Sequence, residues 1–252
     1  MKFNRLIVFF VFGILCAVSV SAAPVGPVAL SVAQSNARNL STAGITVLAE
    51  AGNVSELVIT SVSVTDKWQG YYGNVTHTIT LDDANNKTMY DWRSASPTGE
   101  IYASNSSSVT WADIECQNLS TNYLGDACGG SPETCLNISE IEAGYGANPS
   151  GDDGVDETFN VTPGNGPTIT VGATPLSLCY WAKLYSNDVY DHTGTFNETI
   201  LTVNNTNTLI FASIVNVDQT GFDNGNTDFE MIVLEDGSAA ATTNYYFFVE
   251  LV

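Results

Sequence analysis

Basic residues and histidine are scarce in this chain, and their scarcity removes several classes of function. The 252 residues include 7 Lys and Arg against 27 Asp and Glu, which gives a net charge of −20. A surface this acidic repels phosphate backbones and anionic lipids, so we expect neither nucleic-acid nor membrane-surface partners. The 2 histidines, His77 and His192, leave little basis for His-based catalysis or zinc binding.

Catalytic motifs are also missing from the sequence. It has no nucleophile elbow, no paired-His zinc helix and no phosphate-binding Gly loop. We therefore predict a protein that is not an enzyme. A secreted glycoside hydrolase stays open as an alternative, because its two carboxylates converge only in space and leave no local motif.

The first residues have the order of a secretory signal. Lys2 and Arg5 precede an apolar run at 6–20, and small residues follow before Pro24. We expect cleavage after Ala22 or Ala23, with residues 1–22 as the signal peptide. The mature protein is then extracellular or at the cell surface, with no stable membrane insertion. An uncut anchor is the alternative, since the run is only just long enough to cross a bilayer.

Acceptor sequences for N-glycosylation are spread along the chain and agree with export. We predict a glycoprotein whose glycans cover much of its surface. The sequons begin at Asn39, Asn53, Asn74, Asn86, Asn105, Asn118, Asn137, Asn160, Asn197 and Asn204.

The cysteines predict disulfide bonds. Of the 5 cysteines, Cys16 lies in the leader, and an even number remains in an exported chain. We favour Cys128 with Cys135, because their short separation makes loop closure easy, and Cys116 with Cys179. Other connectivities stay open. A zinc site is disfavoured because no Cys-x-x-Cys spacing occurs.

Short runs of alternating apolar and polar residues predict an all-β fold, an antiparallel β-sandwich-like architecture. A Gly/Asp-rich linker at 144–157 separates β-rich halves at 23–143 and 158–252, which form one body or two docked small sandwiches. Strands are expected at 44–50, 56–65, 75–81, 88–93, 100–104, 158–162, 168–172, 177–184, 208–217, 228–235 and 244–251.

Two acidic loops are candidates for calcium, which prefers several oxygen ligands from a flexible loop. Neither loop matches an EF-hand, and solvated turns are the alternative for both. The candidate ligands are Asp152, Asp153, Asp156 and Glu157 in the first loop, and Asp223, Asn226 and Asp228 in the second.

Aromatic residues are dense between positions 68 and 111, where exposed rings would stack on sugars. Filling a sandwich core is the alternative use of the same side chains. The candidate sugar-binding residues are Trp68, Tyr71, Tyr72 and Trp92.

Several blocks together resemble a recurring pattern in uncharacterised secreted β-rich surface proteins of archaea. The resemblance covers most of the mature chain and implies a cell-surface or extracellular context, with no activity and no site residues attached to it. The blocks are Lys67–Val75, Ile79–Ala84, Tyr90–Trp92, Ala95–Ser104, Gly221–Asn224, Asp228–Val233 and Tyr245–Leu251.

These observations favour a structural surface glycoprotein that self-associates or binds other cell-surface components. It is a candidate subunit of a filament or cell coat, assembled by donating a strand to a neighbour's open sheet edge. The apolar segment Val25–Ser35 is the expected donor, and pairing within its own sheet is the alternative. A carbohydrate-binding adhesin is the second hypothesis.

Overall fold

The computed structural model describes residues 23–39, 43–119, 136–186, 194–204, 206–235 and 242–252. Strands dominate, all ladders are antiparallel and helices are few and short, so the predicted all-β sandwich-like fold is confirmed. No helix in these ranges is long and apolar enough to span a bilayer.

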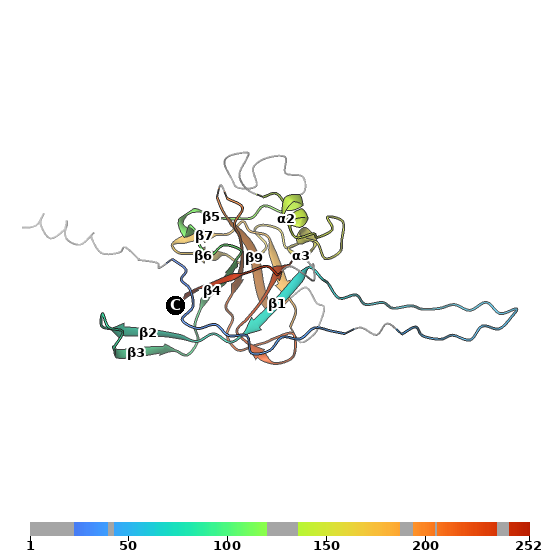
Figure 1. Ribbon diagram of the computed structural model, residues 1–252, viewed down its shortest axis with the longest axis horizontal. Coiled ribbons are helices and arrows are strands. Elements are labelled where there is room, and N and C mark those ends of the chain that lie inside the picture. Colours follow the sequence, from blue (N-terminus) through green and yellow to red (C-terminus); the bar gives the residue numbers. More distant parts are fainter. Residues whose placement is uncertain (1–22, 40–42, 120–135, 187–193, 205, 236–241) are drawn as a thin grey trace, which may run out of the picture.

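A central antiparallel sheet organises the molecule (Figure 1). Two short strands, β5 and β8, share one edge of β9, and β14 lies at the other edge of the sheet. The order is β14 (Tyr246–Leu251), β4 (Gly99–Ser104), β10 (Leu209–Ile214), β9 (Phe196–Val203), then β5 (Ile114–Cys116) with β8 (Trp181–Leu184).

Both faces of the central sheet are buried, and its strand β10 is accordingly apolar almost throughout. In β10, Leu209 and Phe211 face one core cluster, while Ile210 and Ala212 face the other. The first cluster is covered by the β1 (Trp68–Gly73) and β13 (Phe229–Leu234) pair, with α2 (Ile138–Gly144) and α3 (Val155–Thr158). The second is covered by the β6 (Ile169–Val171) and β7 (Thr174–Leu176) hairpin and by Trp111 of η1 (Trp111–Asp113).

Strands from the two sequence halves interleave. Strand β4 lies between β10 and β14, and β1 pairs with β13, so early and late segments share the same ladders. The segment 144–157 includes the start of α3, and its Val155 is fully buried in the core. The described residues of both halves therefore pack around common cores.

A disulfide joins Cys116 to Cys179, which confirms the prediction of disulfide bonding. Cys116 ends β5 opposite Leu201, and Trp181 begins β8 opposite Thr199. The bond therefore fastens together two short strands that meet end to end along β9. Cys128 and Cys135 lie outside the described residues.

Several expected strands differ from those observed. Residues 158–162 begin at the last residue of α3 and make only a bridge between Val161 and Trp181. Strands β1 and β9 were not predicted, and the short β11 (Gln219–Thr220) and β12 (Asn226–Thr227) form a further small hairpin. Residues 44–50 and 56–65, predicted as strands, are extended but join no ladder in the structure.

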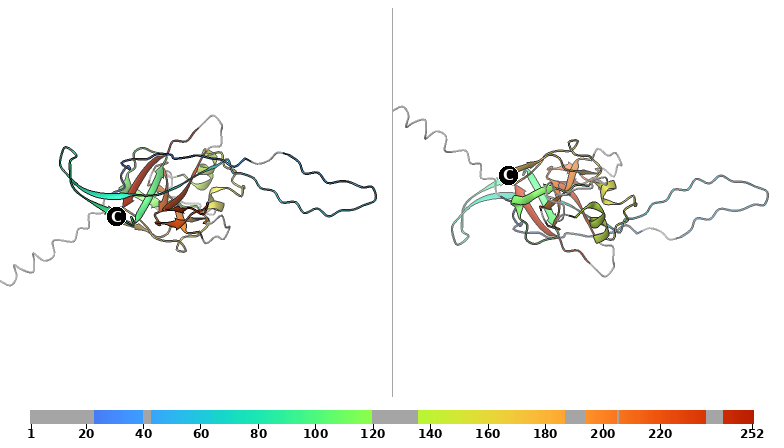
Figure 2. Two further views of the ribbon diagram at one scale, coloured as in Figure 1. Left: turned by 90° about the horizontal axis from the view of Figure 1, so that it is seen from below. Right: turned by 90° about the horizontal axis from the view of Figure 1, so that it is seen from above.

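Two projections leave the body at opposite ends (Figures 1 and 2). One is a long two-legged excursion that contains residues 43–64. The other is the hairpin of β2 (His77–Asp82) and β3 (Thr88–Ser94), which lies at the same end as the C-terminus. In both views of Figure 2 the excursion and the hairpin again leave the body at opposite ends.

Candidate functional site

Residues 43–64, here called the apolar arm, extend away from the body with their apolar side chains in solvent. Ile45, Val54 and Val58 are at least 92% exposed, values typical of an unfolded chain. The other exposed apolar residues of the arm are Val47, Leu48, Leu57, Ile59, Val62 and Val64.

The tip of the arm has a defined turn. Gly52 has a φ of 88°, a left-handed conformation that favours glycine. Asn53 N donates to Glu50 O at 3.2 Å, and its side-chain amide donates to Glu50 Oε2 at 3.0 Å. The two legs thus reverse at a built turn, as in a hairpin.

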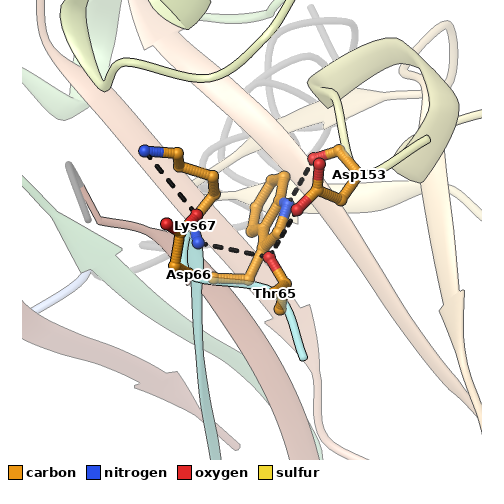
Figure 3. Close-up of polar contacts among 5 residues, drawn as sticks. Thr65, Asp66, Lys67 and Asp153 are labelled. Atoms are coloured by element: carbon orange, nitrogen blue, oxygen red, sulfur yellow. Dashed lines mark hydrogen bonds and ion pairs between the residues drawn. The ribbon is translucent and has the colours of Figure 1, made fainter. Parts of the chain in front are cut away.

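The root of the arm is fastened to the body (Figure 3). The Thr65 hydroxyl donates to Asp153 Oδ2 at 2.6 Å, and Trp68 Nε1 donates to the Asp153 backbone oxygen at 2.8 Å. Before the arm, Gln34 Nε2 donates to the Tyr72 hydroxyl at 3.1 Å. The chain is therefore bonded to β1 or to residues beside it both before and after the arm.

The arm exposes apolar side chains and backbone groups that a partner could bury. Burying a Val, Leu or Ile side chain is worth about 1.5–3 kcal/mol, and the arm exposes many of them. The backbone of residues 44–50 and 56–64 also joins no sheet ladder with the other described residues, which makes the arm a template for pairing with another chain. Exposed apolar stretches of this size mark interaction sites.

The first acidic loop contributes to a carboxylate cluster. Ligand oxygens of Glu142, Asp156 and Glu157 all lie within 4.8 Å of one another. Glu142 is buried and its Oε1 accepts from Val155 N at 3.1 Å. Burial, helped by the hydrogen bond and charge of Asp156, raises the pKa of Glu157.

This cluster has the oxygen chemistry that calcium favours, and the calcium site stays a prediction. Of the four predicted ligands in this loop, the structure brings Asp156 and Glu157 together and uses Asp153 at the arm root. Asp152 is exposed and outside the cluster. Sequence reasoning missed Glu142, because it comes from α2 and its convergence depends on how α2 and α3 pack.

The second acidic loop uses its carboxylates within the fold. Asp228 accepts from Val75 N at 2.7 Å and from Asp218 N at 2.9 Å, one bond to each carboxylate oxygen. Asp223 Oδ1 accepts from Gly225 N at 2.9 Å, and Asn226 belongs to β12. These bonds give the acids a structural role in shaping the turn.

The predicted sugar-binding aromatics are dispersed. Trp68 lies near Phe159 and Phe211 at ring distances of 6.0 and 6.4 Å, and Tyr71 packs on Phe247. Tyr72 packs on Phe222 at 5.0 Å. Trp92 lies on the β2–β3 hairpin beside Tyr90, with rings 4.7 Å apart, and both are more than half exposed.

Comparisons with protein-family models, with curated proteins and with solved structures find no match to this chain. Its function must therefore be argued from its own geometry.

A carboxyl pair lies between β4 and β14. Glu100 and Glu250 are directly opposite in the ladder, and each accepts a backbone N–H from the β6–β7 segment: Thr170 N at 3.5 Å and Gly172 N at 2.9 Å, respectively. Burial raises the pKa of Glu100 to about 7, and the charge of Glu250 adds to the rise. Through these bonds, the pair holds the β6–β7 hairpin on the sheet.

The sequons differ in accessibility. Asn105, Asn118, Asn197 and Asn204 are partly buried, whereas two exposed ones, Asn53 and Asn86, lie at the tip of the arm and in the β2–β3 turn. The exposed sequon residues are Asn39, Asn53, Asn74, Asn86, Asn137 and Asn160.

Proposed function

We propose that this chain is a non-enzymatic, secreted surface glycoprotein that serves as a subunit of a filament or cell coat and assembles by strand donation. The observation that carries the proposal is the apolar arm. Its segments 44–50 and 56–65 have the composition of strands, yet they join no sheet ladder with the other described residues. A second copy supplies what is missing, because paired strands satisfy the backbone and bury alternate side chains.

The arm is a better donor than the expected segment Val25–Ser35. Val25 exchanges backbone hydrogen bonds with Val249, at 3.0 and 2.8 Å, so the beginning of that segment pairs within its own chain. The following apolar residues, Val28, Leu30 and Val32, are exposed and lead toward the arm. They lie between the Val25–Val249 bridge and the hydrogen bond from Gln34 to Tyr72, before the arm leaves the body.

Replacing apolar residues with charged residues on one face of the arm tests the proposal. In an extended chain Val58 and Val62 share a face, while Ser61 and Ser63 share the other. The double substitution Val58→Asp with Val62→Asp should abolish assembly, because it places two charges where apolar contact is needed. The control, Ser61→Asp with Ser63→Asp, adds the same charge to the same leg and should weaken assembly far less.

Assembly is measured by sedimentation velocity over a concentration series and by electron microscopy of the mature protein. Both variants should melt at the wild-type temperature, since the arm lies outside the core. A wild-type protein that stays strictly monomeric at high concentration would contradict the proposal. So would assembly that both double variants support equally.

Carbohydrate binding is a second candidate, favoured by the exposed Tyr90 and Trp92 rings. A glycan array on the monomeric arm variant separates it from assembly. Specific binding that Trp92→Ala removes would support an adhesin.

A further inference from the structure

The hairpin of β2 and β3 has an apolar face that its own chain leaves open. Ile79 lies opposite Trp92, and Leu81 lies opposite Tyr90, so four large side chains gather on one face. All four are more than half exposed. The other face carries Thr78 and Thr80 with their partners Arg93 and Asp91.

The hairpin has a turn defined by hydrogen bonds in spite of this exposure. In its turn, Asp83 N donates to Lys87 O at 3.0 Å, and the Asp83 carboxylate accepts from the backbone N–H groups of Asn85 and Lys87. Those two bonds lower the pKa of Asp83. Yet among the described residues β2 and β3 pair only with each other, and a two-stranded hairpin is only marginally stable alone in water.

We propose that the apolar arm of one copy docks on the β2–β3 hairpin of the next copy, with residues 56–64 adding as a third strand that extends the hairpin's apolar face. This inference rests on the proposed function and names the acceptor. The two partners complement each other: no described strand pairs with the outer edges of the hairpin, and residues 56–64 of the arm are extended and join no ladder in the described part of the chain. Three strands with an apolar face are the smallest stable sheet.

Charge repulsion at this site is smaller than the net charge of the chain suggests. Two copies with a net charge of −20 repel each other, so they can meet closely only where acids are few or offset. In the arm the acids are Glu50 and Glu56. In the hairpin, Lys87 and Arg93 partly offset Asp82, Asp83 and Asp91, and they are among the few basic residues of the chain.

Geometry makes the contact head-to-tail. The arm and the hairpin project from opposite ends of the molecule (Figures 1 and 2), so the arm of each copy reaches outward to the hairpin end of a neighbour. Such a heterologous contact uses two different surfaces, and it repeats without limit unless the rotation closes a ring. A linear polymer follows from one kind of interface.

The first experiment removes the hairpin face and keeps the arm. Ile79→Ser with Trp92→Ser should raise the concentration needed for assembly by about tenfold or more, as expected for loss of buried anchors. Thr78→Ala with Thr80→Ala, on the opposite face, is the matched control and should assemble nearly as the wild type does. Near-ultraviolet and far-ultraviolet circular dichroism check that both variants are folded.

The second experiment mixes two defective copies. A copy with Val58→Asp and Val62→Asp keeps its hairpin, and a copy with Ile79→Ser and Trp92→Ser keeps its arm. Each alone should stay monomeric, but together they should form a one-to-one dimer and nothing longer, because one arm and one hairpin remain. Absence of that dimer would overturn the inference.

Hydrogen exchange provides a readout that does not depend on the variants. On wild-type assembly, backbone amides in 56–64 and in the hairpin should gain protection together. If the arm is protected and the hairpin is not, the acceptor is another edge, such as that of β14, and this inference fails while strand donation stands. If neither gains protection, both proposals fail. Normal assembly of a folded hairpin-face variant would also overturn the inference.

Discussion

Glu100 shows how a single side chain ties the stability of this fold to pH. Its carboxyl group lies opposite Glu250 and is shielded from water, and burial raises its pKa from 4.5 to about 7. Glu230 behaves in the same way, with burial raising its pKa to about 7. Glu198, fully buried on β9, also has its pKa raised by burial, while its Oε2 accepts from Ile232 N at 2.8 Å.

The resulting prediction is that the folded protein is more stable in mild acid. The native state holds these protons to a higher pH than the unfolded chain does, so the free energy of unfolding falls as pH rises from about 4.5 to about 7. Glu100→Gln should flatten this dependence, because it removes the titration and keeps an oxygen for Thr170 N. Urea unfolding across this pH range measures it, with Glu56→Gln on the arm as control. An unchanged slope in Glu100→Gln would contradict it.

Calcium is tested at the Glu142 cluster by removing charge. If the cluster binds calcium, the ion should raise the melting temperature of the native protein by mass action, and a chelator should reverse the rise. Asp156→Asn with Glu157→Gln should lose the response, while Asp152→Asn, outside the cluster, should keep it. An identical melting temperature with calcium and with chelator would contradict the calcium site and favour a solvated turn.

At the scale of elements, the sequence predicted what depends on local pattern and missed what depends on packing. Alternation located β2, β3 and β14, and runs of apolar strand-forming residues located β10 and β13. Strand β9 escaped because it is buried on both faces and half of its residues are polar, so neither alternation nor an apolar run marks it. The packing of β13 gives Glu198 Oε2 a hydrogen-bond donor, Ile232 N, which the sequence does not show.

The candidate site was half visible in the sequence. The composition of 44–50 and 56–65 predicted strands, and the structure shows the same residues extended but unpaired. Single-sequence patterns give a strand's preference and do not name its partner. The alternation of Ile79 and Leu81 with threonines likewise predicts a buried side of β2, whereas the structure leaves that side exposed. Nothing in the pattern distinguishes burial in the same chain from burial against a neighbour.

The disulfide between β5 and β8 is expected to contribute strongly to stability. It closes a loop between residues 63 positions apart, and links of this kind typically contribute about 2–4 kcal/mol. Cys116→Ser with Cys179→Ser should lower the free energy of unfolding by that order, as measured by urea denaturation. A difference below a few tenths of a kcal/mol would show that the β9 ladders alone hold both strands.

The prediction of disulfide bonding also covers Cys128 and Cys135. Since all the cysteines after the leader are predicted to pair, unreduced, denatured protein should bind no thiol reagent. Labelling of one or more thiols in the mature chain would refute the prediction.

For the whole molecule, the acidic charge opposes the association that the arm favours. Salt screens repulsion between copies while leaving apolar contact intact, since the screening length falls from about 30 Å at 0.01 M to about 10 Å at 0.1 M. Assembly should therefore begin at a lower protein concentration as ionic strength rises. Sedimentation in a sodium chloride series measures this, and assembly that weakens with salt would indicate an interface held by ion pairs.

The clamped root of the arm determines how a chain of such subunits would respond to pulling. Tension entering through residues 56–64 passes Thr65 and reaches β1, whose six residues pair along β13. Force applied along the strand loads those hydrogen bonds together in shear, whereas force across it would peel them one by one. The bond from Thr65 to Asp153 and the bond from Gln34 to Tyr72 spread the load over both legs. A cell coat or filament made this way would pass tension from one subunit to the next through β1 and its pairing with β13.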